Sequence, residues 1–171
     1  MTTEVHITDY DPDWPARYEE ARARITEILG DRLVVFEHVG STSVPGLAAK
    51  DIIDMMPGIA TSADLDPCIE PMVAAGYSYC PNYEHLFPDR RLFRMGSGRD
   101  VTEHVHIVPL NCPFWTRHIA FRDRLRTHPE VAAAYEELKL ELAAKHRNER
   151  ANYTDAKTDF IEEQIRLALQ T

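Results

Sequence analysis

The chain of 171 residues is long enough for one domain with a sizeable hydrophobic core, and we predict a single domain over residues 1–171. Its 28 acidic residues outnumber the 19 basic ones, and the formal net charge of −9 excludes a general nucleic-acid-binding surface, which needs clustered cations. The three cysteines show no C-x-x-C spacing and no apolar run is long enough to cross a membrane, so we expect reduced thiols, no membrane partner and a cytoplasmic location.

The first predicted elements are a short strand at Val5–Tyr10 and a helix from Trp14 to about Leu29. Trp14 and the proline after it are typical of a helix start, and Gly30 is typical of a helix end. Apolar residues recur at helical spacing between them, so we expect this helix to pack on a sheet.

A second strand is predicted at Leu33–His38, and a turn of small residues beginning at Gly40 follows it. Gly40, Ser41 and Thr42 combine close backbone approach with N–H groups ahead of a short helical turn. Two interpretations stay open, an anion-binding turn and an ordinary tight turn. A P-loop is excluded because five residues separate Gly40 from Gly46 and no Lys-Ser or Lys-Thr follows.

The strand predicted at Asp51–Met56 contains a carboxylate among apolar residues. Side chains alternate along a strand, so Asp54 shares a face with Ile52 and Met56, whereas Asp51 lies on the other face. A desolvated carboxylate is costly unless it meets a cation or a hydrogen-bond donor. Asp54 is therefore either part of a functional site or a structural carboxylate that pairs with an arginine or with backbone donors.

The rest of the chain predicts an α/β (α+β) fold with a small mixed sheet, helices packed on one face of it and a helical C-terminal half. A helix between Thr61 and Gly76 should be kinked or shortened by Pro71. The further elements are predicted as strands at Tyr77–Cys80, Arg91–Met95 and Val101–Val108, and as helices at Phe114–Thr127, Pro129–Asn148 and Tyr153–Leu169.

Two histidines lie on one face of the strand predicted at Val101–Val108. His104 and His106 are two residues apart, and their face can meet Asp54. They are candidates for metal ligands, for an acid and a base near neutral pH, or for hydrogen bonding at the sheet surface. Asp54 and His106, with His104 or His38 as the further ligand, would form a mixed N/O set that suits Zn²⁺, Mn²⁺ or Fe²⁺ better than Mg²⁺, and a metal-free site is the alternative.

The sequence resembles a known family over nearly its whole length. The run HVGSTSVPGLAAK at residues 38–50, followed by Ile52, Ile53 and Asp54, is similar to the signature of the GrpB family (UPF0157), and further similarity lies at residues 11–15, 104–106 and 121–129. The resemblance implies a fold of the nucleotidyltransferase-like superfamily, of polymerase-β type. That superfamily pairs a Gly-Ser turn with Asp-x-Asp or Asp-x-Glu for Mg²⁺. Gly40, Ser41 and Asp54 match this pattern, but Met56 occupies the position of the second carboxylate.

The family pattern also implies cationic and aromatic positions in the helical half that can approach the glycine turn and neutralise a phosphate or carboxylate. These positions are Arg122, Arg126, Lys139, Tyr153 and Lys157. Lys50, which follows the turn directly, is a further candidate. The alternative is that these charges are solvated or paired with neighbours, as the i, i+4 spacing of Arg122 and Arg126 allows.

The leading hypothesis is a nucleotidyltransferase-like protein that binds a small phosphorylated or anionic ligand, such as a nucleotide. Asp54 and His106 would hold a divalent cation (Mg²⁺, Mn²⁺ or Zn²⁺), with His104 as a further catalytic residue. The ligand would contact Gly40, Ser41, Thr42, Lys50, Arg122, Tyr153 and Lys157. The alternatives are a nucleotide-independent acid/base enzyme that uses His104 or His106 on a small organic (biosynthetic) substrate, and a non-catalytic accessory binding module. The oligomeric state is left open.

Overall fold

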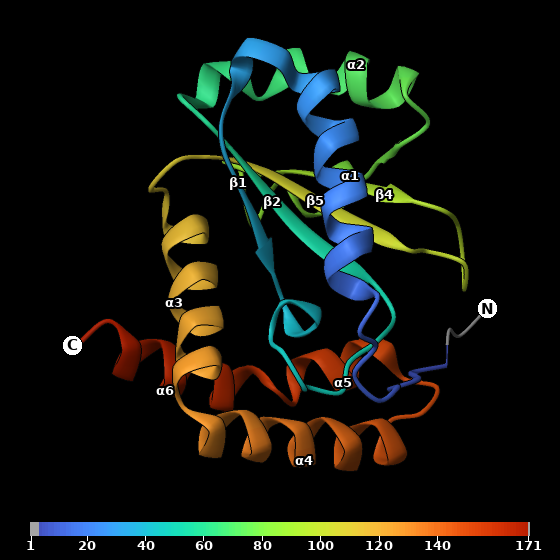
Figure 1. The fold of residues 1–171 in the computed structure, drawn as a ribbon, viewed down its shortest axis with the longest axis vertical. Helices are drawn as coiled ribbons and strands as arrows, with labels where there is room; N and C mark the ends of the chain where they lie inside the picture. Colours follow the sequence, from blue (N-terminus) through green and yellow to red (C-terminus); the bar gives the residue numbers. More distant parts are fainter. Residues whose placement is uncertain (1–3, 171) are drawn as a thin grey trace.

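The computed structural model describes residues 4–170, and within them five strands form one mixed sheet in the order β1-β2-β5-β4-β3 (Figure 1). The strands β2 and β5 are parallel, and the other neighbours are antiparallel. The bounds of the strands are Leu33–Val39 for β1, Ile53–Ile59 for β2, Ser78–Tyr79 for β3, Arg91–Met95 for β4 and Glu103–Pro109 for β5.

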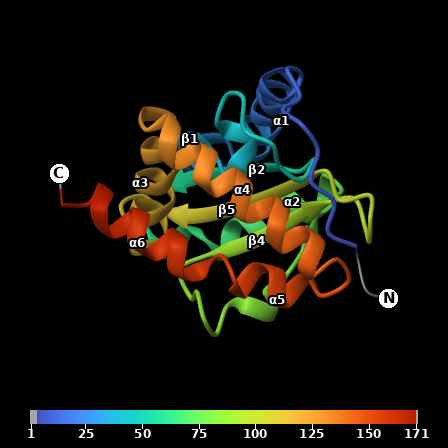
Figure 2. The same ribbon diagram turned by 90° about the horizontal axis from the view of Figure 1, so that it is seen from below.

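Helices precede, interrupt and follow the sheet in the chain. Their bounds are Trp14–Leu29 for α1, Ile69–Ala74 for α2, Pro113–Thr127 for α3, Pro129–Lys145 for α4, Arg150–Asp155 for α5 and Thr158–Ala168 for α6. Figure 2 shows α4, α5 and α6 lying across one end of the sheet. This is the end at which β1 finishes at Val39 and β2 begins at Ile53.

The two faces of the sheet carry different side chains. Ile53, Met55 and Ile59 of β2 are at most 1% exposed and pack with Trp14 and Ile25 of α1 in the main core. This arrangement follows from the period of two along a strand, which sends alternate residues to the same face.

On the other face, α3 covers only one part of the sheet. Met56 of β2 and Val108 of β5 pack beneath Trp115 of α3. Gly58 fits here because a Cβ at that position would lie 3.0 Å from the Trp115 ring. Asp54 projects from the same face of β2 as Met56, beyond the area that Trp115 covers.

The structure confirms the mixed sheet, the helices packed on one face and the helical C-terminal half; it adds α3 on part of the opposite face. The strand Arg91–Met95 has the predicted bounds, and the helix containing Pro71 is shortened to Ile69–Ala74 as expected. No helix in the described part of the chain has the length and apolar character required to span a bilayer.

Two predictions about elements are wrong. Val5–Tyr10 is not a strand, because pairing there is limited to one bridge between Thr8 and Ala49. The helix predicted at Tyr153–Leu169 is divided into α5 and α6 at Ala156 and Lys157. Thr158 and Asp159 start α6, in agreement with the preference for such residues in the first turn of a helix.

Candidate metal and anion-binding site

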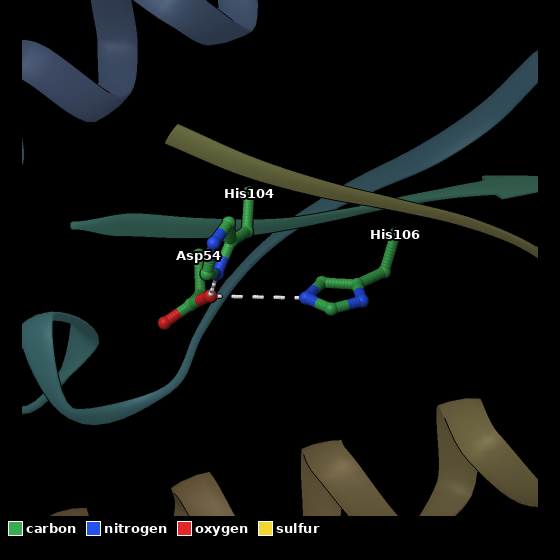
Figure 3. A group of neighbouring side chains, drawn as sticks. All are labelled: Asp54, His104 and His106. Atoms are coloured by element: carbon green, nitrogen blue, oxygen red, sulfur yellow. Dashed lines mark hydrogen bonds and ion pairs between the residues drawn. The ribbon is translucent and has the colours of Figure 1, made fainter. Parts of the chain in front are cut away.

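Asp54, His104 and His106 meet on the face of the sheet beside α3, although 50 residues separate Asp54 from His104 in the chain (Figure 3). Asp54 and His104 are paired in the parallel register of β2 and β5. The Nδ1 atom of His104 lies 3.0 Å from Oδ1 of Asp54, and the Nε2 atom of His106 lies 3.7 Å from the same oxygen. One nitrogen from each ring and the carboxylate oxygen lie within 4.8 Å of one another, so the group could hold a metal ion.

The charges of this group favour an ionised carboxylate next to a neutral imidazole. Burial alone would raise the pKa of Asp54, but hydrogen bonds from His104 and His106 outweigh burial and hold the pKa well below its usual range. Burial lowers the pKa of His106 in spite of the adjacent Asp54. A divalent cation requires these protonation states of its ligands.

The outer nitrogens of both rings are buried and unsatisfied. His104 Nε2 and His106 Nδ1 are enclosed and have no hydrogen-bond partner among residues 4–170. Buried polar atoms in a purely structural cluster are normally paired, so two unpaired nitrogens beside one carboxylate call for another explanation. They are not the nitrogens that face Asp54 Oδ1, so a metal held beside Asp54 would not pair them.

The glycine turn lies directly against the carboxylate. Gly40 has φ +72° and ψ −175°, a conformation that is essentially restricted to glycine. A Cβ at this position would lie 2.7 Å from Oδ2 of Asp54, so only glycine allows the backbone this close. The turn at Ser41–Ser43 that follows therefore starts beside Asp54.

Thr42 also lies in this turn, but its hydroxyl is engaged with the protein. Its Oγ1 is 3.0 Å from Nε2 of His38. Burial lowers the pKa of His38 to about 4, and the ring stacks on Tyr18 with the centroids 4.5 Å apart. His38 is therefore neutral at physiological pH, and we assign it a structural role in supporting the turn.

A cavity of about 370 Å³ opens beside the turn, and a buried lysine reaches it from α4. Lys139 is 2% exposed, donates to Oγ of Ser41 at 3.2 Å and is also bonded to the carbonyl of Ala48. Burial, with help from the charge of Lys157, lowers the pKa of Lys139 to about 7. The lysine is therefore poised between its charged and neutral forms.

Two further lysines line the same cavity around one aromatic ring. The Nζ atoms of Lys50 and Lys157 lie 4.5 Å and 4.3 Å from the ring centroid of Tyr153. The ring is 1% exposed, and cation–π contacts of this kind are strengthened when they are desolvated. Lys50 precedes β2, whereas Tyr153 lies on α5, so this contact joins the turn region to the C-terminal helices.

The structure brings nearly all predicted site residues to this one cavity. The residues that line it include Gly40, Ser41, Thr42, Lys50, Asp54, His104, His106, Tyr153 and Lys157. Their roles in binding or catalysis stay predictions.

Arg122 and Arg126 lie outside this cavity. The guanidinium of Arg122 is 8% exposed and is bonded to Glu37, to Asp123 and to the carbonyl of His38. Since these groups use its donors, Arg122 fastens α3 to β1 and does not line the cavity.

His118 lines the cavity but was missed in the sequence. Its Nδ1 lies 2.8 Å from the carbonyl of Phe114, and its ring stacks on that of Phe114 at 3.9 Å. Burial and the nearby His106 lower its pKa to about 4. A histidine within a helix has no local signal for such a position, because only the packing of α3 on the sheet brings it to the cavity.

Comparisons with known proteins agree with the family signature. Residues 4–166 match the family described as GrpB protein. The chain belongs to the GrpB family. A crystal structure of GrpB from Enterococcus faecalis is similar, with a TM-score of 0.87 and 36% identity over 96% of this chain and 98% of that one. The predicted resemblance to the family is thereby confirmed, whereas its place among nucleotidyltransferases stays a prediction.

Two similar proteins carry the family designation UPF0157 in their names. UPF0157 protein SCO7215 of Streptomyces coelicolor is 38% identical over 92% of this chain and 81% of its own length. UPF0157 protein YqkA of Bacillus subtilis is 36% identical over 92% of this chain, but the chain spans only 45% of YqkA.

Proposed function

We propose that this GrpB-family chain binds a small phosphorylated ligand, such as a nucleotide, together with a divalent cation in the cavity beside the Gly40 turn. A nucleotidyltransferase-like fold is part of this proposal. The observation that carries it is that one cavity combines a metal-type group on β2 and β5 with three lysines and a glycine turn.

The chemistry of the cavity favours phosphate over other ligands. The carboxylate and two imidazoles would leave coordination positions open on a bound metal, and phosphate oxygens are suitable occupants. Lys139 and its neighbours Lys50 and Lys157 would neutralise the remaining charge. Within an acidic chain, such a local excess of lysines supports an anionic ligand.

The missing second carboxylate has a structural explanation. Met56 is fully buried under Trp115, so it belongs to the packing between β2 and α3. His104 and His106 on β5 would replace the missing carboxylate as ligands, which would shift the metal preference from Mg²⁺ toward Mn²⁺ or Zn²⁺. In nucleotidyl transfer, an acceptor oxygen would bond to the α-phosphorus, lose its proton to a base, and release pyrophosphate.

A second candidate is supported by the contact between Asp54 and His104. A carboxylate 3.0 Å from an imidazole nitrogen fixes the tautomer and orientation of the ring, as general acid/base catalysis requires. This pair would act on a small organic substrate without a nucleotide. A non-catalytic accessory binding module would bind the same ligands without turnover.

Thermal-shift measurements can test the proposal. The chelator-treated protein is mixed with Zn²⁺, Mn²⁺ or Mg²⁺, and then with ATP, CTP, GTP, UTP or pyrophosphate. At a ligand concentration about 100 times Kd, linkage adds about 2.7 kcal/mol to the free energy of unfolding, equivalent to a rise in Tm of about 5–10 °C. Asp54→Asn should weaken metal binding at least about tenfold.

Asp51→Asn is the matched control, because Asp51 is three residues away, bonds to Arg17 and Trp14, and does not line this cavity. Lys139→Met should weaken nucleotide binding and leave binding of the metal alone unchanged. If no nucleotide or pyrophosphate stabilises the wild-type protein in the presence of any of the metals, the proposal is wrong. Pyrophosphate release in the presence of candidate acceptors then distinguishes transfer from binding alone.

A further inference from the structure

Two arginines at β4 have no acidic partner within residues 4–170, although the chain contains 28 acidic residues. Arg91, between them in sequence, shows the usual arrangement, because its Nη2 lies 2.8 Å from Asp66. Arg94 and Arg90 make no ion pair and donate no side-chain hydrogen bond in this described part of the chain. Since carboxylates are abundant here, two unpaired guanidiniums in one short segment require an explanation.

Arg94 stands beside the metal-type group. It is the cross-strand partner of His104 in the antiparallel pair of β4 and β5, so the two side chains lie on the same face of the sheet, about 5 Å apart at Cβ. Its Nε atom is enclosed and has no hydrogen-bond partner among the described residues. A buried donor without an acceptor is unfavourable, and an anion beside His104 would satisfy it.

Arg90, just before β4, packs against two aromatic rings, one of which contacts His106. Its guanidinium carbon is 4.6 Å from the centroid of Phe87 and 5.1 Å from that of Phe114. The Phe114 ring in turn lies 5.5 Å from the ring of His106. Arg90 is 8% exposed, and rings that cover the faces of a guanidinium leave its N–H edge available for bonds in the plane.

Glu84 is the acidic residue that most favours the charged form of Arg90, but its carboxylate already contacts other side chains. Glu84 is bonded to the hydroxyl of Tyr79 and lies 3.6 Å from Nε of Arg91. Arg90 therefore keeps a buried positive charge that no carboxylate in the described chain neutralises at contact distance. No nitrogen of Arg90 is among the enclosed unpaired atoms, so water solvates this charge until an anion replaces the water.

We propose that Arg94 of β4 and Arg90, which directly precedes this strand, form a second anion subsite beside His104 and His106 that binds the carboxylate or phosphate group of an acceptor molecule. This deepens the proposed function, on which it partly rests, because it makes the second substrate an anionic molecule placed next to the metal-type group. The planar, forked guanidinium suits two-point recognition of either oxoanion.

The arginine Nε–Hε signals of the ¹⁵N-labelled full-length protein can test this subsite directly. Inorganic phosphate and acetate are titrated separately, and Arg94→Gln, Arg91→Gln and Arg90→Lys assign the signals. We expect the Arg94 and Arg90 signals to move saturably with at least one of the anions while the Arg91 signal stays in place. Arg94→Gln should weaken binding at this subsite by about tenfold or more.

The backbone amides of Gly40 and Ser41 report on the lysine side of the cavity in the same spectra. If these amides respond and the Arg94 signal does not, the subsite is refuted and the proposed phosphate site stands. If only the arginines respond, the subsite is supported and the proposed function fails. Arg94→Gln could weaken binding only because it destabilises the protein. Arg94→Lys keeps the charge, so it should bind the anion more tightly than Arg94→Gln does. A variant that loses stability but keeps the affinity of the wild type would assign Arg94 a purely structural role.

Discussion

Lys139 has an ammonium group that is buried and donates hydrogen bonds to the turn after β1. Its ammonium group is enclosed between α4 and the turn after β1, where it bonds to Ser41 and to the Ala48 carbonyl. Burial and Lys157 lower its pKa to about 7, whereas Glu136 acts in the opposite direction. An anion in the cavity would favour the protonated form, so binding and protonation of Lys139 are linked.

We therefore predict that anion affinity depends on pH through Lys139. The lysine is charged below pH 7 and loses its proton as the pH rises, so sulfate, which does not titrate in this range, should bind less tightly by at most about tenfold per pH unit between pH 7 and 9. Calorimetric titrations from pH 6.5 to 9 can measure this slope. Lys139→Met should bind weakly and independently of pH; a wild-type slope that survives in this variant would contradict the prediction.

The same lowered pKa affects folding without a ligand. The unfolded chain holds the Lys139 proton up to its ordinary pKa near 10.5, whereas the folded chain releases it near 7. The unfolded state thus binds more protons between these values, so this lysine makes the free energy of unfolding rise with pH across that window.

The turn between β1 and β2 is the element on which the site depends most. The turn approaches Asp54 so closely that residue 40 must have a positive φ and no Cβ, and Gly40 meets both requirements. Arg126 of α3 donates from Nε and Nη2 to the carbonyl of Ser43 and supports the turn from the helical side. Local sequence predicted a tight turn here, but the contact with β2 decided which of its groups face the carboxylate.

Gly40→Ala should damage both the fold and the metal group. The positive φ should cost about 1–3 kcal/mol of unfolding free energy, and the added Cβ, 2.7 Å from Asp54 Oδ2, should displace the carboxylate. Gly46→Ala is the matched control, because Gly46 also has a positive φ (+80°) but a Cβ there would meet no described neighbour within 4 Å. Urea denaturation and metal titration of both variants should show lost stability in each and lost metal affinity only in Gly40→Ala.

At the scale of the whole molecule, Tyr153 joins parts of the chain that are distant in sequence. It packs with Val5 near the N-terminus and with Leu142 of α4. Its ring also contacts Lys50 before β2 and Lys157 at the start of α6. Tyr153 therefore both lines the cavity and packs the C-terminal helices against the rest of the protein.

Tyr153→Leu should lower the free energy of unfolding by about 1–3 kcal/mol, because it removes two cation–π contacts and part of the packed ring. Tyr153→Phe keeps the ring and should stay within about 1 kcal/mol of the wild type. Denaturant midpoints of the two variants provide the comparison. Equal losses in both would assign the effect to the hydroxyl and not to the ring.

Periodicity and turn residues in the sequence were sufficient to predict the strands, α1, α3, the shortened helix at Pro71 and the acidic strand residue Asp54, because these depend on spacing within about ten residues. The family pattern added Lys139, Tyr153 and Lys157 as candidates, and Lys50 followed from its place directly after the turn. Local pattern failed at Val5–Tyr10, where strand formation depended on a partner strand that the structure does not supply.

Only the tertiary structure decided which of these groups meet. The parallel register of β2 and β5 aligned Asp54 with His104, and helix packing brought His118 and Lys139 to the cavity while Arg122 bonded to Glu37 outside it. The sequence also could not predict that Arg94 Nε lacks a hydrogen-bond partner among residues 4–170, because this depends on all the residues packed around it. Side-chain direction follows from local period, whereas distance, burial and charge balance arise from contacts between segments far apart in the chain.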